Sequence, residues 1–312
     1  MRRYHNFLYI CHGTFDETEG LKQALSLARI NEKPLKVLVV SPEFPEEFPD
    51  YRGKYEEALL AQAKASIKSS MEAIKMEEGS IDITVESISD QRPSIRIIQY
   101  VLQHGHDFVI KDASPRDAKG GFKALDMNLL RQCPSPLWLC RPIKHSRQHI
   151  QVAVAIDPKS EGPAAEALSI RMLQLSRSLA DNCNGELDVV SCWDYPYERY
   201  LRDSVWIKVS EDEVVRTVNE SKNSHRAALE NIVEASSIGG SFRVHHLRGN
   251  PAELIPSFTV DKKIDILVMG TVARAGIPGF MIGNTAENIA QKITCSLLAL
   301  KPQGFVSPIN AY

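Results

Sequence analysis

Short apolar runs alternate with helical patterns twice along the chain of 312 residues, and this repeat limits the fold more than any other feature. The run that opens each half lacks the polar–apolar alternation of a half-exposed strand, so we expect these two strands to be covered on both faces. In the first half the apolar runs begin at residue 7 and then occupy 35–40, 81–88, 107–110 and 136–140; in the second half they begin at residue 152 and then occupy 187–192, 242–247, 264–269 and 297–300.

Strands that alternate with helices in this way are typical of α/β domains with parallel sheets. The repeat therefore predicts two tandem α/β domains, over residues 1–143 and 150–304, and the chain length also favours about two domains. Pro93 and Pro251 each fall in the first turn of a predicted helix, where proline is favoured.

Composition excludes several classes of protein. A formal net charge of −2, without a run of Lys and Arg, argues against nucleic acid as a partner. The apolar stretch after the first residues is too short for a signal peptide or a membrane span, so we expect no membrane partner and a cytoplasmic location. The six cysteines are scattered and form no CxxC, which predicts reduced thiols rather than disulfides or a structural zinc site.

The segment 264–287 has the pattern of an anion site. Its apolar run ends at Gly270, a Gly-rich loop of about a dozen residues follows, and a helix is predicted to begin near Gly283. Asn284 suits the N-cap of that helix, with Glu287 three residues later completing a capping box. A strand end, a flexible loop and a helix N-terminus together offer backbone N–H groups and a positive dipole end, so we expect any bound phosphate here.

With these features the sequence resembles the universal stress protein family in its tandem two-domain form, over nearly the whole chain. The nucleotide motif of that family is Gly, two residues, Gly, nine residues, Gly, and then Ser or Thr. Gly270, Ala273, Gly283 and Asn284 stand at the matching positions, so the second and fourth depart from the motif. Asp157, after the first strand of the second half, matches the family's Asp.

The resemblance implies doubly wound, five-stranded parallel sheets in the strand order 3-2-1-4-5, as in adenine nucleotide α-hydrolase-like folds. It also implies ATP or another adenine nucleotide over the carboxyl ends of strands one and four of the second half, at the topological switch point. Arg274 lies in the loop, where it could reach a phosphate. The nucleotide-binding candidates are Asp157, Cys192, Met269, Gly270, Ala273, Arg274, Gly283, Asn284 and Thr285.

Two readings of Asp157 stay open. Its carboxylate could coordinate a nucleotide-bound Mg²⁺, which prefers oxygen ligands, or it could order the loop before Pro158. In the first half, His12 stands where Asp157 stands and Lys111 is matched to Gly270, which makes an ATP site there improbable. These two residues either hold some other anion or are polar loop residues.

Other polar and aromatic groups have structural interpretations. His245 and His246 lie in a strand pattern and should point to opposite faces. His104 and His106 flank Gly105 at the end of a predicted helix, where cations favour the dipole. The aromatic stretch 193–206 could cover a ligand or a partner, although burial against the sheet is the default.

No nucleophile, base and oxyanion donor come together in the sequence, so we expect a protein that is not an enzyme, with slow ATP hydrolysis at most. The leading hypothesis is a cytoplasmic stress-response protein that binds a nucleotide in its second domain and acts through other proteins. The alternative is a ligand-free interaction scaffold with a vestigial loop. Family members generally pair through the last strand, which predicts an intramolecular pseudo-dimer through 136–140 and 297–300; whether two chains form a homodimer is left open.

Overall fold

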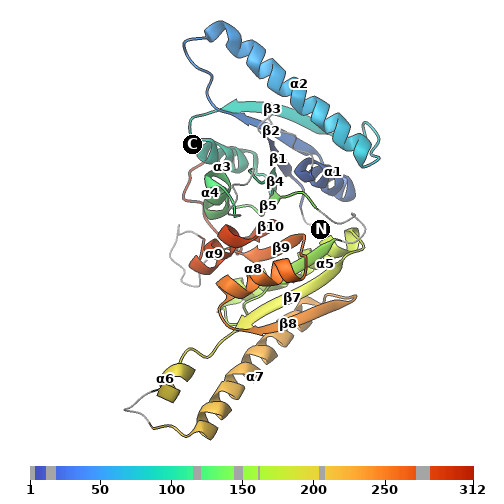
Figure 1. Cartoon of the computed structure of the whole chain (residues 1–312). Helices are drawn as coiled ribbons and strands as arrows, with labels where there is room; N and C mark the ends of the chain where they lie inside the picture. Colours follow the sequence, from blue (N-terminus) through green and yellow to red (C-terminus); the bar gives the residue numbers. More distant parts are fainter. Residues whose placement is uncertain are drawn as a thin grey trace.

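One sheet of ten strands runs through both halves of the chain (Figure 1). The computed structural model describes residues 4–11, 19–114, 121–143, 150–160, 162–203, 208–271 and 282–312. The strand order is β3-β2-β1-β4-β5-β10-β9-β6-β7-β8. The strands are β1 (Phe7–Cys11), β2 (Leu35–Ser41), β3 (Ile83–Ser89), β4 (Phe108–Asp112), β5 (Leu137–Cys140), β6 (Gln151–Ala155), β7 (Glu186–Trp193), β8 (Phe242–Arg248), β9 (Ile266–Gly270) and β10 (Ser296–Leu300).

Each half has the predicted strand order 3-2-1-4-5, and all strand pairs within a half are parallel. The halves join through the antiparallel pair β5–β10, in which Leu297 faces Leu139 and Leu298 faces Trp138. The predicted fold class and the predicted contact through the last strands are confirmed. A sheet that continues through both halves does not mark a boundary between them. Residues 1–143 and 150–304 therefore remain our proposed bounds for the two units.

Helices cover both faces of the sheet, as a doubly wound fold requires. One core layer contains side chains of α1, α2, α5 and α7, and the other contains side chains of α3, α4, α8 and α9. None of the helices that the structure describes is long and apolar enough to cross a membrane. The helices are α1 (Glu19–Asn31), α2 (Pro49–Ala73), α3 (Pro93–His104), α4 (Ala124–Gln132), α5 (Pro163–Asn182), α6 (Glu198–Asp203), α7 (Glu211–Ser236), α8 (Pro251–Asp261) and α9 (Asn284–Lys292).

Burial of the strands decreases from the centre of the sheet to its edges. β1 is buried along its whole length and β6 along its middle three residues, which agrees with the predicted coverage of the first strand of each half. The edge strands β3 and β8 consist of half-buried and exposed residues. An edge strand has a neighbour on one side only, so the helices shield it less than they shield the central strands.

Two basic residues connect the halves beside the strand pair. Arg141 follows β5 and donates to the carbonyl oxygen of Ile293, at the end of α9, at 3.0 Å. Lys301 follows β10 and donates to the carbonyl oxygen of Leu130, in the last turn of α4, at 2.8 Å. Each cation thus lies at the negative end of a helix in the other half, where the helix dipole stabilises it.

Candidate functional site

The carboxyl ends of β6 and β9 lie side by side in the second half, where the chain leaves the sheet toward opposite faces. Asp157 follows β6 by two residues, and Gly270 is the last residue of β9. Cys192 lies near the end of β7, which pairs with β6 on its other side. The structure thus brings three of the predicted residues to one edge of the sheet, at its topological switch point.

Gly270 is explained by close packing against α5. A Cβ atom at this position would lie 3.2 Å from Leu168 Cδ2 and 3.7 Å from Met172 Sδ. A side chain here would press on the helix, whether or not a ligand approaches the backbone. The adjacent Met269 is buried in the core, so only its backbone is available at the edge.

The loop between β9 and α9 has both of its ends held together. The Gly283 N–H donates to the Thr271 carbonyl oxygen at 2.8 Å, and the Thr271 N–H donates to Leu300 at 3.1 Å. This pairing brings the N-terminus of α9 to the end of β9, as the sequence predicts. Ala273 and Arg274 lie outside the described residues.

The predicted capping of α9 is wrong. Gly283 is the N-cap, and Asn284 is the first helical residue, with no side-chain cap. Glu287 is consequently the fourth helical residue, one position beyond that of a capping box, and it forms an ion pair with Arg131 of α4. Asn284 and Thr285 are exposed, and the first-turn N–H groups of this helix have no intrahelical partner.

Asp157 orders its own loop. Its Oδ1 accepts a hydrogen bond from the Lys159 N–H at 3.1 Å, and its carbonyl oxygen accepts from the Ser160 N–H at 3.3 Å. This agrees with the loop-ordering reading, whereas Mg²⁺ coordination stays a prediction. The neighbouring Cys192 thiol has its pKa raised to about 11, first by burial and then by the charge of Asp157, so it is a neutral side chain rather than a nucleophile.

In the first half, side chains of the chain itself occupy the positions that are equivalent to the candidate site. The Ala113 N–H donates to Cys140 at 2.8 Å, as the Thr271 N–H does to Leu300, so Asp112 and not Lys111 is equivalent to Gly270. The match of Lys111 to Gly270 was thus wrong by one residue, which in a strand places the side chain on the opposite face. The Asp112 carboxylate accepts from the Gly20 N–H in the first turn of α1 at 2.8 Å and from the Tyr9 hydroxyl at 2.7 Å.

Lys111 points to the other face and is already paired with an anion. Its Nζ lies 3.0 Å from Asp126 Oδ1 in the first turn of α4, and both side chains are almost fully buried. The second carboxylate oxygen of Asp126 accepts from the Ser114 N–H at 2.8 Å. The anion that the sequence left open for Lys111 is therefore a carboxylate of the chain itself. His12 lies outside the described residues.

Comparisons with known proteins agree with this division of the chain. The model of the universal stress protein family matches residues 149–301, which is the half that keeps Gly270 and Asp157. Universal stress protein E of Escherichia coli strain K12 is 27% identical over 99% of this chain and 98% of its own length. That of Photorhabdus laumondii is 26% identical over 100% of this chain and 99% of its own length. Residues 149–301 belong to the universal stress protein family.

Solved structures support the fold of the whole chain. A protein of unknown function from Pseudomonas aeruginosa PAO1 has a TM-score of 0.72 at 20% identity, covering 97% of this chain and 95% of its own. A universal stress protein from Archaeoglobus fulgidus has a TM-score of 0.61 at 16% identity, covering 95% of this chain and 98% of its own. The tandem arrangement is thus found in full-length relatives.

Sequence reasoning missed His225, which comes from α7 to the edge of the site. Its Nδ1 lies 2.9 Å from His246 Nε2, and burial lowers its pKa to about 4. His245 instead contacts Asp188 at 2.7 Å, and its ring packs on Phe258 of α8. The two neighbouring histidines therefore face opposite sides of the sheet, as predicted. No spacing rule could have found His225, because this residue lies more than 30 residues after the end of β7, in the middle of α7.

The aromatic stretch after β7 is divided between core and surface. Trp193 is buried against Val214 and Val218. Tyr197, just before α6, and Tyr200, on α6, are exposed, and α6 extends away from the sheet (Figure 1). Trp206 lies outside the described residues.

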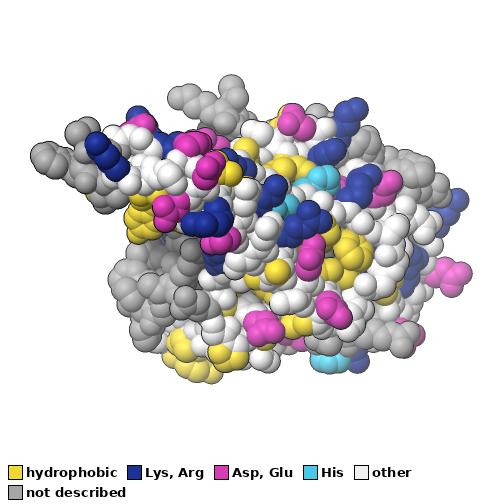
Figure 2. Space-filling model, turned by 90° about the horizontal axis from the view of Figure 1, so that it is seen from below, with side chains coloured by type: hydrophobic (Ala, Val, Ile, Leu, Met, Phe, Trp, Pro, Cys, Tyr) yellow, Lys and Arg dark blue, Asp and Glu magenta, His cyan; other side chains and the backbone are white. Residues whose placement is uncertain are grey.

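Figure 2, which views the molecule from the β8 end of the sheet, shows acidic and basic side chains intermixed rather than one continuous basic patch.

Proposed function

We propose that the second half binds an adenine nucleotide, of which ATP is our first candidate, and that the chain acts as a cytoplasmic stress-response protein through other proteins. The observation that carries this proposal is the contrast between the two halves. In the first half, Asp112 and Asp126 place carboxylates at the N-termini of α1 and α4. The equivalent positions of the second half are Gly270 and Ala286, which have no charge.

Among the described residues, no carboxylate fills the N-terminus of α9 as Asp126 fills that of α4, and Glu287 of its first turn is paired with Arg131, so we expect this helix end to accept an external anion. Its first-turn N–H groups and the positive end of its dipole favour a phosphate group. Asp157, at the end of β6, would lie on the same side and could hold a Mg²⁺ carried by the phosphates. Among the described residues no group of three His, Cys, Asp or Glu side chains could hold a metal ion, so we expect Mg²⁺ to arrive with the nucleotide.

A binding role fits the chemistry better than catalysis. Cys192 is a neutral thiol, and His225 is committed to His246. We therefore expect hydrolysis of bound ATP to be slow at most. No disulfide links the six cysteines, all of which the structure describes, and this fits the proposed location in the reducing cytoplasm.

The test is calorimetric titration with Mg·ATP of the wild type and the N284D variant. Asn284 is the exposed first residue of α9, so an aspartate there should favour the helix dipole and preserve folding. Its charge would repel a phosphate bound at the same helix end. We expect the Kd of N284D to rise at least tenfold, which corresponds to about 1.4 kcal/mol.

The matched control is A124D, which adds the same charge at the first residue of α4. Because Asp126 already fills that helix end, A124D should leave the Kd unchanged. Mass spectrometry of small molecules released from the denatured protein should also detect an adenine nucleotide. No heat of binding, or equal affinity of N284D and the wild type, would instead favour the scaffold with a vestigial loop.

A further inference from the structure

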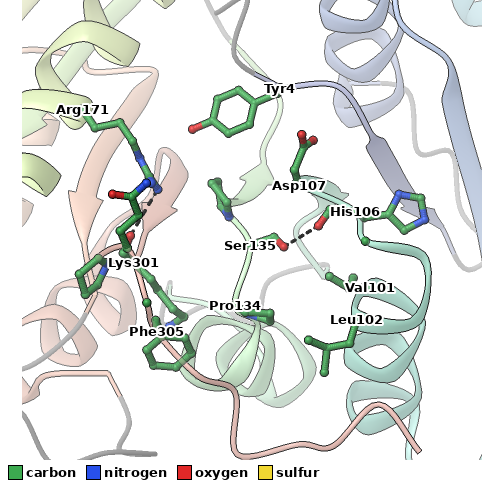
Figure 3. Close-up of a pocket in the computed structure, with 15 residues that line it drawn as sticks. Tyr4, Val101, Leu102, His106, Asp107, Pro134, Ser135, Arg171, Lys301 and Phe305 are labelled. Atoms are coloured by element: carbon green, nitrogen blue, oxygen red, sulfur yellow. Dashed lines mark hydrogen bonds between the residues drawn. The ribbon is translucent and has the colours of Figure 1, made fainter. Parts of the chain in front are cut away.

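A cavity of about 410 Å³ lies between the two halves, where the tail that follows β10 meets the first half (Figure 3). Its walls come from both halves: Tyr4 before β1, Asp107 before β4, the end of α3, the turn 134–136, Arg171 of α5 and residues 301–305. None of the described candidate nucleotide residues lines it. The cavity is thus separate from the proposed nucleotide site.

The guanidinium of Arg171 has N–H groups that form no hydrogen bond. It donates one hydrogen bond, from Nη2 to the Lys301 carbonyl oxygen at 3.3 Å. Its Nε is buried without a hydrogen-bond partner, and it has no acidic partner among the described residues. A half-buried guanidinium whose charge is uncompensated favours an anion from outside the chain.

The other charged groups of the cavity are already satisfied. The two Asp107 carboxylate oxygens accept from the His5 and Asn6 N–H groups at 2.8 and 2.9 Å. The Lys301 ammonium donates to the carbonyl oxygens of Leu130 and Arg131. Arg171 is therefore the charged group best placed to bind a ligand.

The rest of the wall combines apolar side chains with polar groups. Figure 3 shows Phe305, Pro134 and Leu102 along one side of the cavity, with Tyr4 across from them. The volume falls in the range of small-molecule sites, about 300 to 1,000 Å³. A ligand that fits such walls has one compact anionic group and a flat apolar body.

We propose that this cavity binds a small organic carboxylate, with its charge on Arg171 and its apolar body against Phe305 and Tyr4. A carboxylate matches the planar fork of a guanidinium, which can donate two parallel hydrogen bonds. Because the walls come from both halves, the ligand would also strengthen the contact between them. The inference does not depend on nucleotide binding.

The experiment titrates the full chain with 2-naphthoate, followed by the fluorescence of the probe, and compares naphthalene-2-carboxamide, which has the same shape without charge. We expect the carboxamide to bind at least tenfold more weakly. R171M should weaken 2-naphthoate binding at least tenfold, and F305A should weaken the acid and the amide alike. A saturating amount of Mg·ATP should not displace the probe.

The matched control is R177M on the same helix. Arg177 also donates one backbone hydrogen bond, to Ser241 at 2.9 Å, but it does not line the cavity. It should bind 2-naphthoate as the wild type does. If circular dichroism shows that R171M has lost its fold, R171K, which keeps the charge without the fork, must still bind at least threefold more weakly. No binding, equal loss in R177M, or displacement by Mg·ATP would overturn the proposal.

Discussion

At the residue scale, His106 shows how burial controls a titratable side chain. It follows α3, is 4% exposed and stacks on Tyr100 with ring centroids 5.7 Å apart. Burial lowers its pKa from 6.5 to about 4, because the charged imidazolium would lose its hydration. The helix-end position was predicted from the sequence, but the charge expected there was not found.

This shift predicts a loss of stability in acid. As the pH falls through 6.5, the unfolded chain takes up a proton at this histidine, while the folded chain stays neutral until about pH 4. The free energy of unfolding should therefore fall over that window by up to about 3 kcal/mol from this group, and the contribution is fully present above pH 6.5.

Urea unfolding at pH 7 and at pH 4.5 measures this loss. The difference in the free energy of unfolding between pH 7 and pH 4.5 should be about 1 to 2 kcal/mol smaller in H106F than in the wild type. The phenylalanine keeps the ring stacking but cannot take up a proton. His225, whose pKa is also lowered to about 4, should preserve part of the acid dependence. H5Q, at an exposed position, is the control. Equal acid dependence in H106F and the wild type would refute the assignment.

At the scale of elements, the loop before α4 approaches α9 so closely that only glycine fits. Gly121 has φ +76°, and a Cβ there would overlap the carbonyl oxygen of Gln291 and lie 2.9 Å from its carbon. We expect G121A to lower the free energy of unfolding by about 2 to 4 kcal/mol, since the neighbour is backbone and the φ is strained.

The control is G53A in α2, where nothing lies within 4 Å of the added Cβ. It should raise stability by about 0.5 to 1 kcal/mol, because alanine favours a helix over glycine. Urea denaturation of both variants checks the pair. A G121A protein as stable as the wild type would mean that the loop before α4 can move away from α9 without a loss of stability.

The elements also show what the sequence can and cannot predict. Apolar runs and proline-initiated helices were enough to predict two α/β halves, whereas the strand order of each half came from the resemblance to the universal stress protein family. The run before Lys111 predicted a strand that ended at Ile110, but β4 continues to Asp112 because Lys111 has a buried partner in α4. Glu287 was likewise assigned to a local cap, although its partner is in the other half. Local patterns cannot reveal partners that only the tertiary fold brings close.

Part of the candidate site could likewise be predicted from the sequence, and part required the structure. Asp157 and Cys192 were predicted through the resemblance to the family, and Gly270 also because it ends an apolar run. The sequence aligned Lys111 rather than Asp112 with Gly270, an error of one residue. The correct alignment required the hydrogen bonds of the Ala113 and Thr271 N–H groups, and it shows which helix N-terminus has a carboxylate beside it. The role of Gly270 in packing against α5 also required the coordinates.

At the scale of the whole molecule, the continuous sheet predicts cooperative unfolding. The β5–β10 pair, Arg141, Lys301 and the Arg131–Glu287 ion pair all connect the halves. Each half would lose these contacts if the other unfolded. We expect hydrogen exchange, measured by mass spectrometry in urea, to give the same midpoint for peptides from β2 and β7.

The R141M variant tests the same coupling. Arg141 links Gly121 and Ile293, so its loss should lower both midpoints together. R177M, whose hydrogen bond stays within the second half, should leave the two midpoints coincident. Two separate transitions in the wild type would show that the halves are independent units.

The two halves that β5 and β10 join belong to one polypeptide, so the molecule need not be symmetric. In an assembly of two identical chains, every substitution appears twice, so a site cannot be closed in one copy and kept in the other. Here the two halves differ in sequence and are always present in a ratio of one to one. Asp112 and Asp126 can fill the first half while Gly270 and Ala286 leave the equivalent positions of the second half without charge. Under the proposed function, the second half would change with its ligand while the first stayed the same, as a fixed reference within one chain.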